Sequence, residues 1–199
     1  MTTDHLPPLP GDLDDLRRRL SGHRPRRAVD PRRSRGWQAA TAVVVAPTDG
    51  GLCLAVIERT ERHGDRWSGQ MALPGGRRDP ADPDLVTTAR RETYEETGLT
   101  LGHPLARLDD HRRRTRSGVV ANFVFVLGEA PTLRPDPREV ADAWWLPLAE
   151  VVSPERAVHH HYGGVPFPGI EHRGRVIWGL TRGTLDAFTR AIGIPLPTP

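Results

Sequence analysis

Three glutamates near the middle of the chain have the clearest chemical potential: Glu92, Glu95 and Glu96 follow a Gly75-Gly76 pair. In a helix, residues three and four positions apart lie on one face. Three carboxylates on one face repel one another, at roughly 0.2–0.5 kcal/mol per pair. A hard divalent cation such as Mg²⁺ removes this repulsion, because it takes oxygen ligands and works with phosphate substrates. The spacing therefore predicts a metal site for phosphate chemistry.

A helix from about Asp84 to Thr97 is predicted to hold these glutamates. The segment Asp82-Pro83-Asp84 supplies an acidic N-cap candidate at its start. Gly98 follows its last residue and suits the left-handed conformation that closes many helices. The glycine pair precedes this helix, and a brief strand over residues 70–73 is expected to lead into it.

The rest of the chain predicts a mixed sheet. Two short apolar runs, 39–46 and 52–57, flank the turn sequence PTDGG and are typical of a β-hairpin. The run 119–127 is the strongest strand signal. Further strands are expected at 143–146, 165–168 and 176–178, with helices at 11–20 and 180–192. Because these elements do not alternate regularly as βαβ units, they indicate an α+β fold.

Composition fits one domain of ordinary size. We divide the 199 residues into a Pro- and Arg-rich, partly disordered extension (1–36), one domain (37–193) and an extended tail (194–199). No apolar run approaches the 18 residues of a membrane span, and the first residues lack the features of a secretory signal. The single cysteine, Cys53, permits no intramolecular disulfide and is expected to be a buried strand thiol. These features predict a cytoplasmic protein.

Basic residues gather between Arg17 and Arg35, although the net charge is only +3. Such a run is typical of a nucleic-acid-binding arm. However, the chain contains no lysine at all, so a general preference for arginine explains the run without selection for phosphate contacts. An RNA-binding protein would also need aromatic platforms near the arm, where only Trp37 lies. We therefore interpret the arm as a solvated tail and do not expect a nucleic-acid partner.

The segment from Gly75 to Leu99 resembles the Nudix box, the signature of the Nudix hydrolase superfamily. That pattern is G-x5-E-x7-R-E-U-x-E-E-x-G-U, where U is apolar, and the chain matches it at Arg91-Glu92, Glu95-Glu96, Gly98 and Leu99. It departs from it in three ways. Asp82 replaces the early glutamate, one extra residue separates Asp82 from Arg91, and Thr93 replaces the apolar U. The resemblance implies an α/β/α sandwich with a mixed sheet, and hydrolysis of a nucleoside diphosphate joined to a group X.

With this extra residue, the segment resembles the branch of the superfamily that hydrolyses coenzyme A, which carries the same extension. The branch pattern G-Q-V-A-F-P-G-G corresponds here to GQMALPGG over residues 69–76, and the closing segment over residues 177–181 also resembles it. The branch's upstream motif R-S-x-x-L-R-x-H-x-G-Q is half matched. Arg59-Thr60 fits its start, but the loop to Gly69 is one residue longer and Trp67-Ser68 replaces His-x. Coenzyme A or a related ADP-containing metabolite is the implied substrate.

The resemblance also implies individual roles. Glu92 and Glu96 are the expected ligands of Mg²⁺ or Mn²⁺. Glu95 is a further ligand of this ion or a second one, and a carbonyl of the glycine pair, assigned to Gly76, adds an oxygen. Glu92 is the first choice for general base, although several Nudix enzymes take the base from another loop. Arg91 is expected to orient a neighbouring glutamate by a charge-assisted hydrogen bond, so Glu92, Glu95 and Arg91 form the catalytic set.

Four residues before the box are expected to contact the substrate: Arg59, Arg66, Trp67 and Gln70. Asp82 is either a helix N-cap or a further acidic group of the site. Glu139 is either a strand-edge residue or an extra acid. His159, His160 and His161 are expected in a mobile polar loop, because three consecutive histidines do not easily face one ion.

Other readings remain open. Within the hydrolases, the substrate is alternatively a nucleotide sugar, a dinucleotide or a nucleoside triphosphate. A Nudix-fold ligand sensor that has lost catalysis is a rival, although the intact glutamates argue against it. Nudix enzymes are often dimers, so a homodimer is possible; neither the oligomeric state nor the substrate follows from the box.

Overall fold

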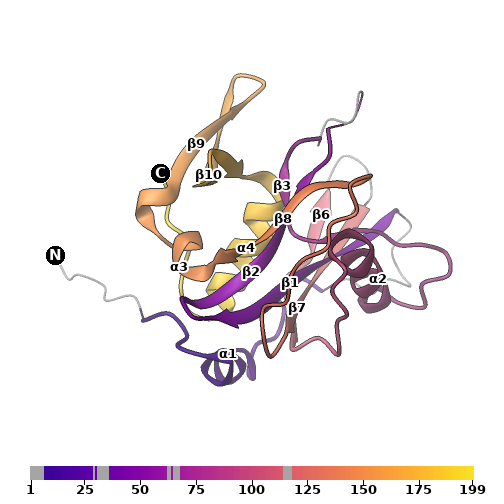
Figure 1. Ribbon diagram of the computed structural model, residues 1–199, viewed down its shortest axis with the longest axis horizontal. Helices are drawn as coiled ribbons and strands as arrows, with labels where there is room; N and C mark the ends of the chain where they lie inside the picture. The colour runs from indigo at the N-terminus through magenta and orange to yellow at the C-terminus, as the bar shows by residue number, and fades with distance from the viewer. Residues whose placement is uncertain (1–6, 29, 31–35, 62–63, 65–67, 114–117) are drawn as a thin grey trace.

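The fold is built around a mixed eight-stranded sheet between two helical layers. The computed structural model describes residues 7–28, 30, 36–61, 64, 68–113 and 118–199. The central strands β1 (Gln38–Thr48) and β7 (Gly118–Val126) run parallel, whereas the other pairs in this sheet are antiparallel. The neighbour order is β3-β2-β1-β7-β5, with β4 on β1, β6 on β7 and β8 on β2. This mixed sheet confirms the predicted α+β class (Figure 1).

Six further strands of the described residues complete this sheet, and only β2 and β8 among them are longer than three residues. They are β2 (Gly51–Arg59), β3 (Met71–Ala72), β4 (Gly75–Arg77), β5 (Ala106–Arg107), β6 (His111–Arg113) and β8 (Val140–Pro147). The predicted hairpin is confirmed, since β1 and β2 pair with Val45 opposite Leu54. Cys53 lies buried in β2 as predicted, its thiol donating to the Ala46 carbonyl, and burial raises the pKa of that thiol to about 11.

Alternation along β1 divides the core into two parts. Val43 and Val45 face the cluster that holds α1 (Leu13–Leu20) and α4 (Gly179–Ala191), whereas Ala42 and Val44 face α2 (Leu85–Thr97). Helix α2 thus covers one face of the sheet, whereas α1 and α4 lie on the other (Figure 1). This is the α/β/α sandwich that the resemblance implies.

Residues of the predicted N-terminal extension take part in this core. Leu16 and Leu20 of α1 are buried in the α4-side cluster, and Asp12 caps the helix by accepting from the Asp15 amide. At the other end of the chain, Leu196 is also buried there. The helix predicted at residues 11–20 is confirmed, whereas the domain boundary at residue 37 stays a prediction.

A second, three-stranded sheet follows the main one in the chain. After α3 (Leu148–Val151) and the 3-10 turn η2 (Pro154–Arg156), the strands β9 (Ala157–Tyr162), β10 (Val165–His172) and β11 (Arg175–Ile177) pair antiparallel. Their hairpin projects beside the main sheet in Figure 1, with β11 in contact with β3 and β10 in contact with α4. The loop expected for His159–His161 was wrong. These residues form β9, where alternate polar side chains face solvent while the backbone pairs with β10.

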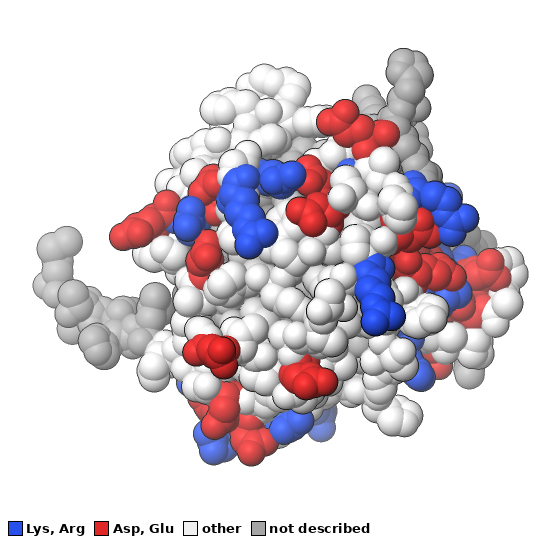
Figure 2. Space-filling model, viewed as in Figure 1, with Lys and Arg blue, Asp and Glu red and all other residues white. Residues whose placement is uncertain are grey.

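The surface carries charge of both signs. Figure 2 shows basic and acidic side chains interspersed over the visible face. Within the described part of the chain, no helix has the length and apolar character needed to cross a membrane.

Candidate active site

The helix α2 lies within one residue of its predicted bounds and ends at Gly98, as predicted. Asp84 is the N-cap, and its side chain accepts from the Thr87 amide at 2.7 Å. Gly98 closes the helix in the left-handed conformation (φ 74°). Thr93, which replaces the apolar residue of the box, is fully buried and donates its hydroxyl to the Ala89 carbonyl at 2.7 Å. This bond satisfies the hydroxyl within the helix, so the departure leaves no unpaired buried donor.

Glu96 is the most buried of the three glutamates, with 2% of its surface exposed. Its carboxylate accepts from the Gly75 amide at 2.8 Å. The pKa of Glu96 is raised to about 8, mainly by burial. The charges of Glu92 and Glu139 act in the same direction, whereas the hydrogen bond from Gly75 and the charge of Arg59 oppose the rise. A carboxylate in this position lacks a full counter-charge.

Glu92 lies directly against the glycine pair. A Cβ added to Gly76 would collide with the Glu92 carboxylate, and one added to Gly75 would collide with the backbone of β1 at Ala40 and Thr41. Gly75 also has a φ of 150°, which disfavours a side chain. The Gly75-Gly76 turn therefore brings its backbone into contact with Glu92, which lies one helical turn before Glu96. Burial raises the pKa of Glu92 as well, although Arg91 opposes this.

Arg91 connects the acidic groups on the outer side of the helix. Its guanidinium contacts Glu92 and Glu95, each at 2.9 Å, and Asp82 at 3.0 Å. A fourth bond goes to the Arg77 carbonyl at 2.9 Å. These contacts place Arg91 where it orients neighbouring glutamates. Glu95 itself is half exposed, with 51% of its side chain accessible.

Asp82 is not the N-cap, so that interpretation was wrong. The chain reaches Asp84 before the helix begins, because the segment holds an additional residue, and Asp84 takes the cap. Asp82 is 4% exposed and accepts from the Thr88 hydroxyl and from Nε and Nη2 of Arg91. Arg91 lowers the pKa of Asp82 below its usual value of 3.8.

Glu139 stands at a second approach to the carboxylates. It directly precedes β8, as a strand-edge residue would, and its carbonyl accepts from the Thr60 amide at 3.0 Å. Its charge also raises the pKa of Glu92 and Glu96. The strand-edge reading of Glu139 thus agrees with the structure, whereas its role as an extra acid stays a prediction.

The predicted substrate contacts fall into two groups. Arg59 and Gln70 are paired through their backbones, since the Arg59 amide donates to the Gln70 carbonyl at 3.0 Å. The charge of Arg59 acts on Glu96, so Arg59 lies near that carboxylate. Arg66 and Trp67 lie outside the described residues.

The two tryptophans of β8 have structural partners. Trp144 is buried and stacks on His172 at 6.0 Å between ring centroids. Trp145 packs against the core on the α2 side and donates from Nε1 to the Pro131 carbonyl at 2.8 Å.

The donor set suits a divalent cation. No group of three His, Cys, Asp or Glu side chains in the described ranges is already gathered around one point. Glu96 nevertheless is a buried oxygen donor and Glu92 a half-buried one, beside the backbone of Gly75 and Gly76, and the charge of Glu92 raises the pKa of Glu96. Hard oxygen ligands of this kind fit Mg²⁺ or Mn²⁺.

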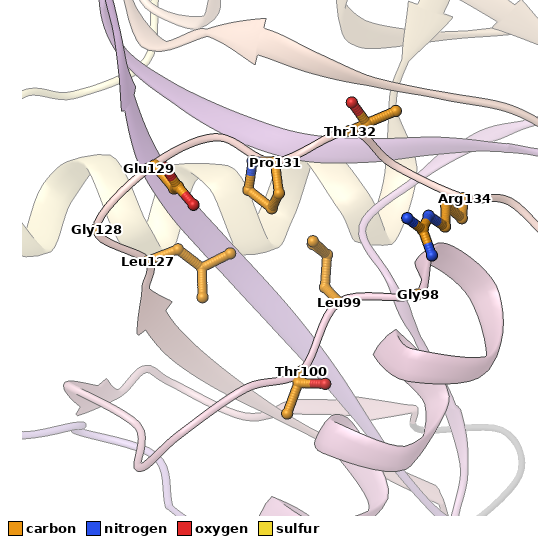
Figure 3. Close-up of a pocket in the computed structure, with 9 residues that line it drawn as sticks. All are labelled: Gly98, Leu99, Thr100, Leu127, Gly128, Glu129, Pro131, Thr132 and Arg134. Atoms are coloured by element: carbon orange, nitrogen blue, oxygen red, sulfur yellow. The ribbon is translucent and has the colours of Figure 1, made fainter.

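A larger hollow lies elsewhere on α2. It has a volume of about 500 Å³ and lies where the helix ends, between residues 98–100 and the loop 127–134 (Figure 3). Leu99 and Leu127 line it, while Glu129 and Arg134 lie apart from each other in the close-up. None of the three box glutamates lines it. This hollow is therefore distinct from the candidate active site, despite its volume.

Comparisons with known proteins identify the family of this chain. Residues 36–166 match the family model of the NUDIX domain, so the chain belongs to the Nudix hydrolase superfamily. It is 33% identical over 159 residues to the human protein named mitochondrial coenzyme A diphosphatase NUDT8, a match that covers 75% of this chain and 66% of that protein. Nudix hydrolases act on pyrophosphate bonds, generally with divalent metal ions.

Two further relatives show the range of similarity. Nudix hydrolase NudL of Yersinia pestis is 30% identical over 148 residues, covering 70% of this chain and 72% of that protein. The protein C14C4.10c of Schizosaccharomyces pombe is 41% identical over 109 residues, covering 50% of this chain and 33% of that protein. The chain thus spans a third of the yeast relative and about two thirds of the human one.

Proposed function

We propose that this protein is a metal-dependent pyrophosphohydrolase that cleaves coenzyme A or a related ADP-containing metabolite. Three observations support this substrate class. A relative carries the name coenzyme A diphosphatase, the segment GQMALPGG resembles that branch, and the spacing from Asp82 to Arg91 contains its additional residue.

The observation that carries the proposal is the position of the buried Glu96 carboxylate and the half-buried Glu92 carboxylate against the glycine turn. Glu96 accepts from the Gly75 amide, and Glu92 lies in contact range of Gly76. Burial disfavours the charge on both, and no arginine pairs directly with Glu96 among the ion pairs of the described residues. A site that concentrates negative charge in this way favours a divalent cation over an empty state.

Each residue then has a defined role. Glu92 and Glu96 would hold the ion, with the Gly76 carbonyl and Glu95 as further ligands. The bound ion supplies charge neutralisation of the phosphates and a lowered pKa for water. Glu92 is the proposed general base. Arg91 is a positioning residue, because it holds Glu92 and Glu95 at 2.9 Å.

Substrate contact is proposed for residues next to this centre. Arg59 and Gln70 pair through their backbones beside β2 and β3, and Arg66 and Trp67, which precede Gln70 in the sequence, complete the proposed set. We also propose a cytoplasmic location and a homodimer, which cell fractionation and light scattering of the purified protein would test.

A substrate screen tests the proposal. Coenzyme A, ADP-ribose, NADH, nucleotide sugars and nucleoside triphosphates are incubated with Mg²⁺ or Mn²⁺, and the products are identified. We expect release of 4′-phosphopantetheine and 3′,5′-ADP, with turnover abolished by a chelator. Turnover of a different compound with coenzyme A untouched would assign the protein to the nucleotide-sugar, dinucleotide or triphosphate hydrolases. Binding without turnover of any compound would instead indicate a ligand sensor.

A further inference from the structure

A cavity of about 330 Å³ lies between β3 and the three-stranded sheet. Residues from both sides line it: Gly69, Gln70, Met71, His160, Tyr162, Gly174, Arg175, Val176 and Trp178. This volume is at the lower end of the range for ligand pockets, about 300–1,000 Å³. The cavity therefore suits one ring-sized part of a substrate, with the remainder extending outside it.

Aromatic rings dominate one wall of this cavity. Trp178 is buried, and the rings of His160, Tyr162 and Phe167 surround it at centroid distances of 4.5, 5.0 and 5.5 Å. Tyr162 nevertheless keeps 40% of its surface exposed. The cluster thus holds an exposed phenol ring against a rigid support, which is the arrangement that stacks planar ligands.

The charge of the cavity excludes a phosphate as its preferred occupant. Arg175 is the one charged side chain among the described lining residues. Its Nη2 lies 2.6 Å from the Glu58 carboxylate, so its charge is already neutralised by a partner. Gln70 offers an amide donor and acceptor without charge. A neutral planar ring with polar edges satisfies both the stacking wall and this amide.

Backbone hydrogen bonds link residues that line the cavity to Arg59, whose charge acts on the carboxylate centre. Gly69 donates its amide to the Arg59 carbonyl at 3.1 Å, and Arg59 donates to the Gln70 carbonyl at 3.0 Å. The charge of Arg59 acts in turn on Glu96. Along the chain, Gln70 and Gly75 are five residues apart, at most about 18 Å when extended. A nucleotide arm that begins at the carboxylates can therefore end in the cavity.

We propose that this cavity binds the nucleobase of the substrate, stacked on Tyr162 and His160. The assignment rests on the proposed function, because it names the end of the same nucleoside diphosphate substrate. It makes the three-stranded sheet the element that selects the base, while α2 carries out the chemistry. Trp178 is a positioning residue here, since it supports both rings.

Inhibition by AMP and by ribose 5-phosphate tests this directly, because the two probes differ only by the base. For Tyr162→Ala and His160→Ala, we expect the inhibition constant of AMP and the KM of the substrate to rise about 10-fold each. The kcat should stay unchanged, because a contact made equally in ground and transition states affects KM alone. Inhibition by ribose 5-phosphate should not change. Tyr162→Phe keeps the ring, so its inhibition constant for AMP and its KM should rise much less than those of Tyr162→Ala.

The matched control is His161→Ala. His161 is the neighbouring residue on β9, is exposed and does not line the cavity, so its variant should leave every constant at the wild-type value. Unaltered AMP inhibition in Tyr162→Ala would overturn the proposal, as would an equal loss for ribose 5-phosphate or a rise in KM without any change for AMP. If the wild-type protein hydrolyses nothing, the proposed function fails separately. Calorimetric binding of AMP to wild type and Tyr162→Ala then still decides the nucleobase site.

Discussion

Two buried carboxylates, one in the loop before α2 and one in the last turn of α2, have opposite electrostatic environments. Asp82 and Glu96 are almost equally buried, at 4% and 2% exposure. Arg91 holds the pKa of Asp82 below 3.8, whereas burial raises the pKa of Glu96 to about 8. Burial alone therefore does not decide the behaviour of an acid in this protein. The presence or absence of a direct guanidinium partner does.

We interpret Asp82 as a structural acid and propose Glu96 as a functional one. Asp82 has its charge satisfied by Arg91 and by the Thr88 hydroxyl, so it ties the loop before α2 to the helix. Glu96 has one amide donor, from Gly75, and two acidic neighbours. A group held in such an environment without compensation indicates a role beyond folding. The comparison therefore predicts opposite effects for the two neutralising substitutions.

The largest effect is expected for Glu96→Gln. Glutamine keeps the acceptor for the Gly75 amide but removes the charge, so kcat should fall by about 10²-fold or more. Stability in the presence of a chelator should rise, by on the order of 1–3 kcal/mol at pH 8, because no charge is buried. Steady-state kinetics and urea denaturation measure the two effects. Turnover near that of wild type in a folded variant would contradict the assignment of Glu96 as a metal ligand.

Gly76→Ala should have the next largest effect. The new methyl group would occupy the position of the Glu92 carboxylate, and displacing a catalytic group by about 1 Å is sufficient to lower the rate by up to about 10²-fold. We expect at least a 10-fold lower kcat, measured with the best substrate of the screen. Gly102→Ala is the control, because a Cβ there meets nothing within 4 Å. Equal activities of the two variants would show that Glu92 is not needed in its present position.

The sequence predicts the local parts of this site well. The cap at Gly98, the helix before it and the main strands depend on residues near in sequence, so short-range rules find them, although they placed the N-cap at Asp82 instead of Asp84. Short-range rules could not distinguish the electrostatic environments of Asp82 and Glu96. Asp82 meets Arg91 across nine residues and Glu96 meets Gly75 across 21, and only the folded chain brings these pairs together.

The three-stranded sheet shows a different limit. His159 to His161 give no alternation of apolar and polar residues, so their sequence suggests a loop. They become a strand because β10 supplies backbone partners and because Trp178, distant in the chain, packs on the ring of His160. Tertiary contacts of this kind override local propensity. The proposed base-binding wall was therefore outside the reach of the sequence, although Gln70 at its edge was named.

Asp82→Asn should lower stability, in contrast to Glu96→Gln. The substitution leaves Arg91 without its buried counter-charge, and we expect a loss of about 2 kcal/mol in the free energy of unfolding. Asp84→Asn is the matched control, because asparagine caps helices as well as aspartate does. Urea denaturation of both variants measures the difference. An Asp82→Asn variant as stable as wild type would remove the distinction between the two acids.

The effect of Asp82 should also depend on pH in a defined direction. Its pKa is lower in the folded protein than in the unfolded chain, so its stabilisation is fully present above the unfolded value of 3.8. It is lost as the pH falls through the lower folded value. The stability difference between wild type and Asp82→Asn should therefore be constant from about pH 8 to pH 5 and shrink below pH 3.8. A difference that grows in acid would contradict the ion pair.

The smallest effects are expected at two buried threonines of α2, and they refine the comparison. Thr88 donates to the Asp82 carboxylate at 2.9 Å, whereas Thr93 donates to a helix carbonyl at 2.7 Å. Thr88→Val removes a donor to a buried charge and should lower stability by about 1 kcal/mol. Thr93→Val should stay within about 0.5 kcal/mol of wild type, because the Ala89 carbonyl remains an acceptor of the helix itself. Equal losses of stability in thermal and urea unfolding would mean that both hydroxyls stabilise the fold to the same extent. The charge of Asp82 would then not strengthen the hydrogen bond that it accepts from Thr88.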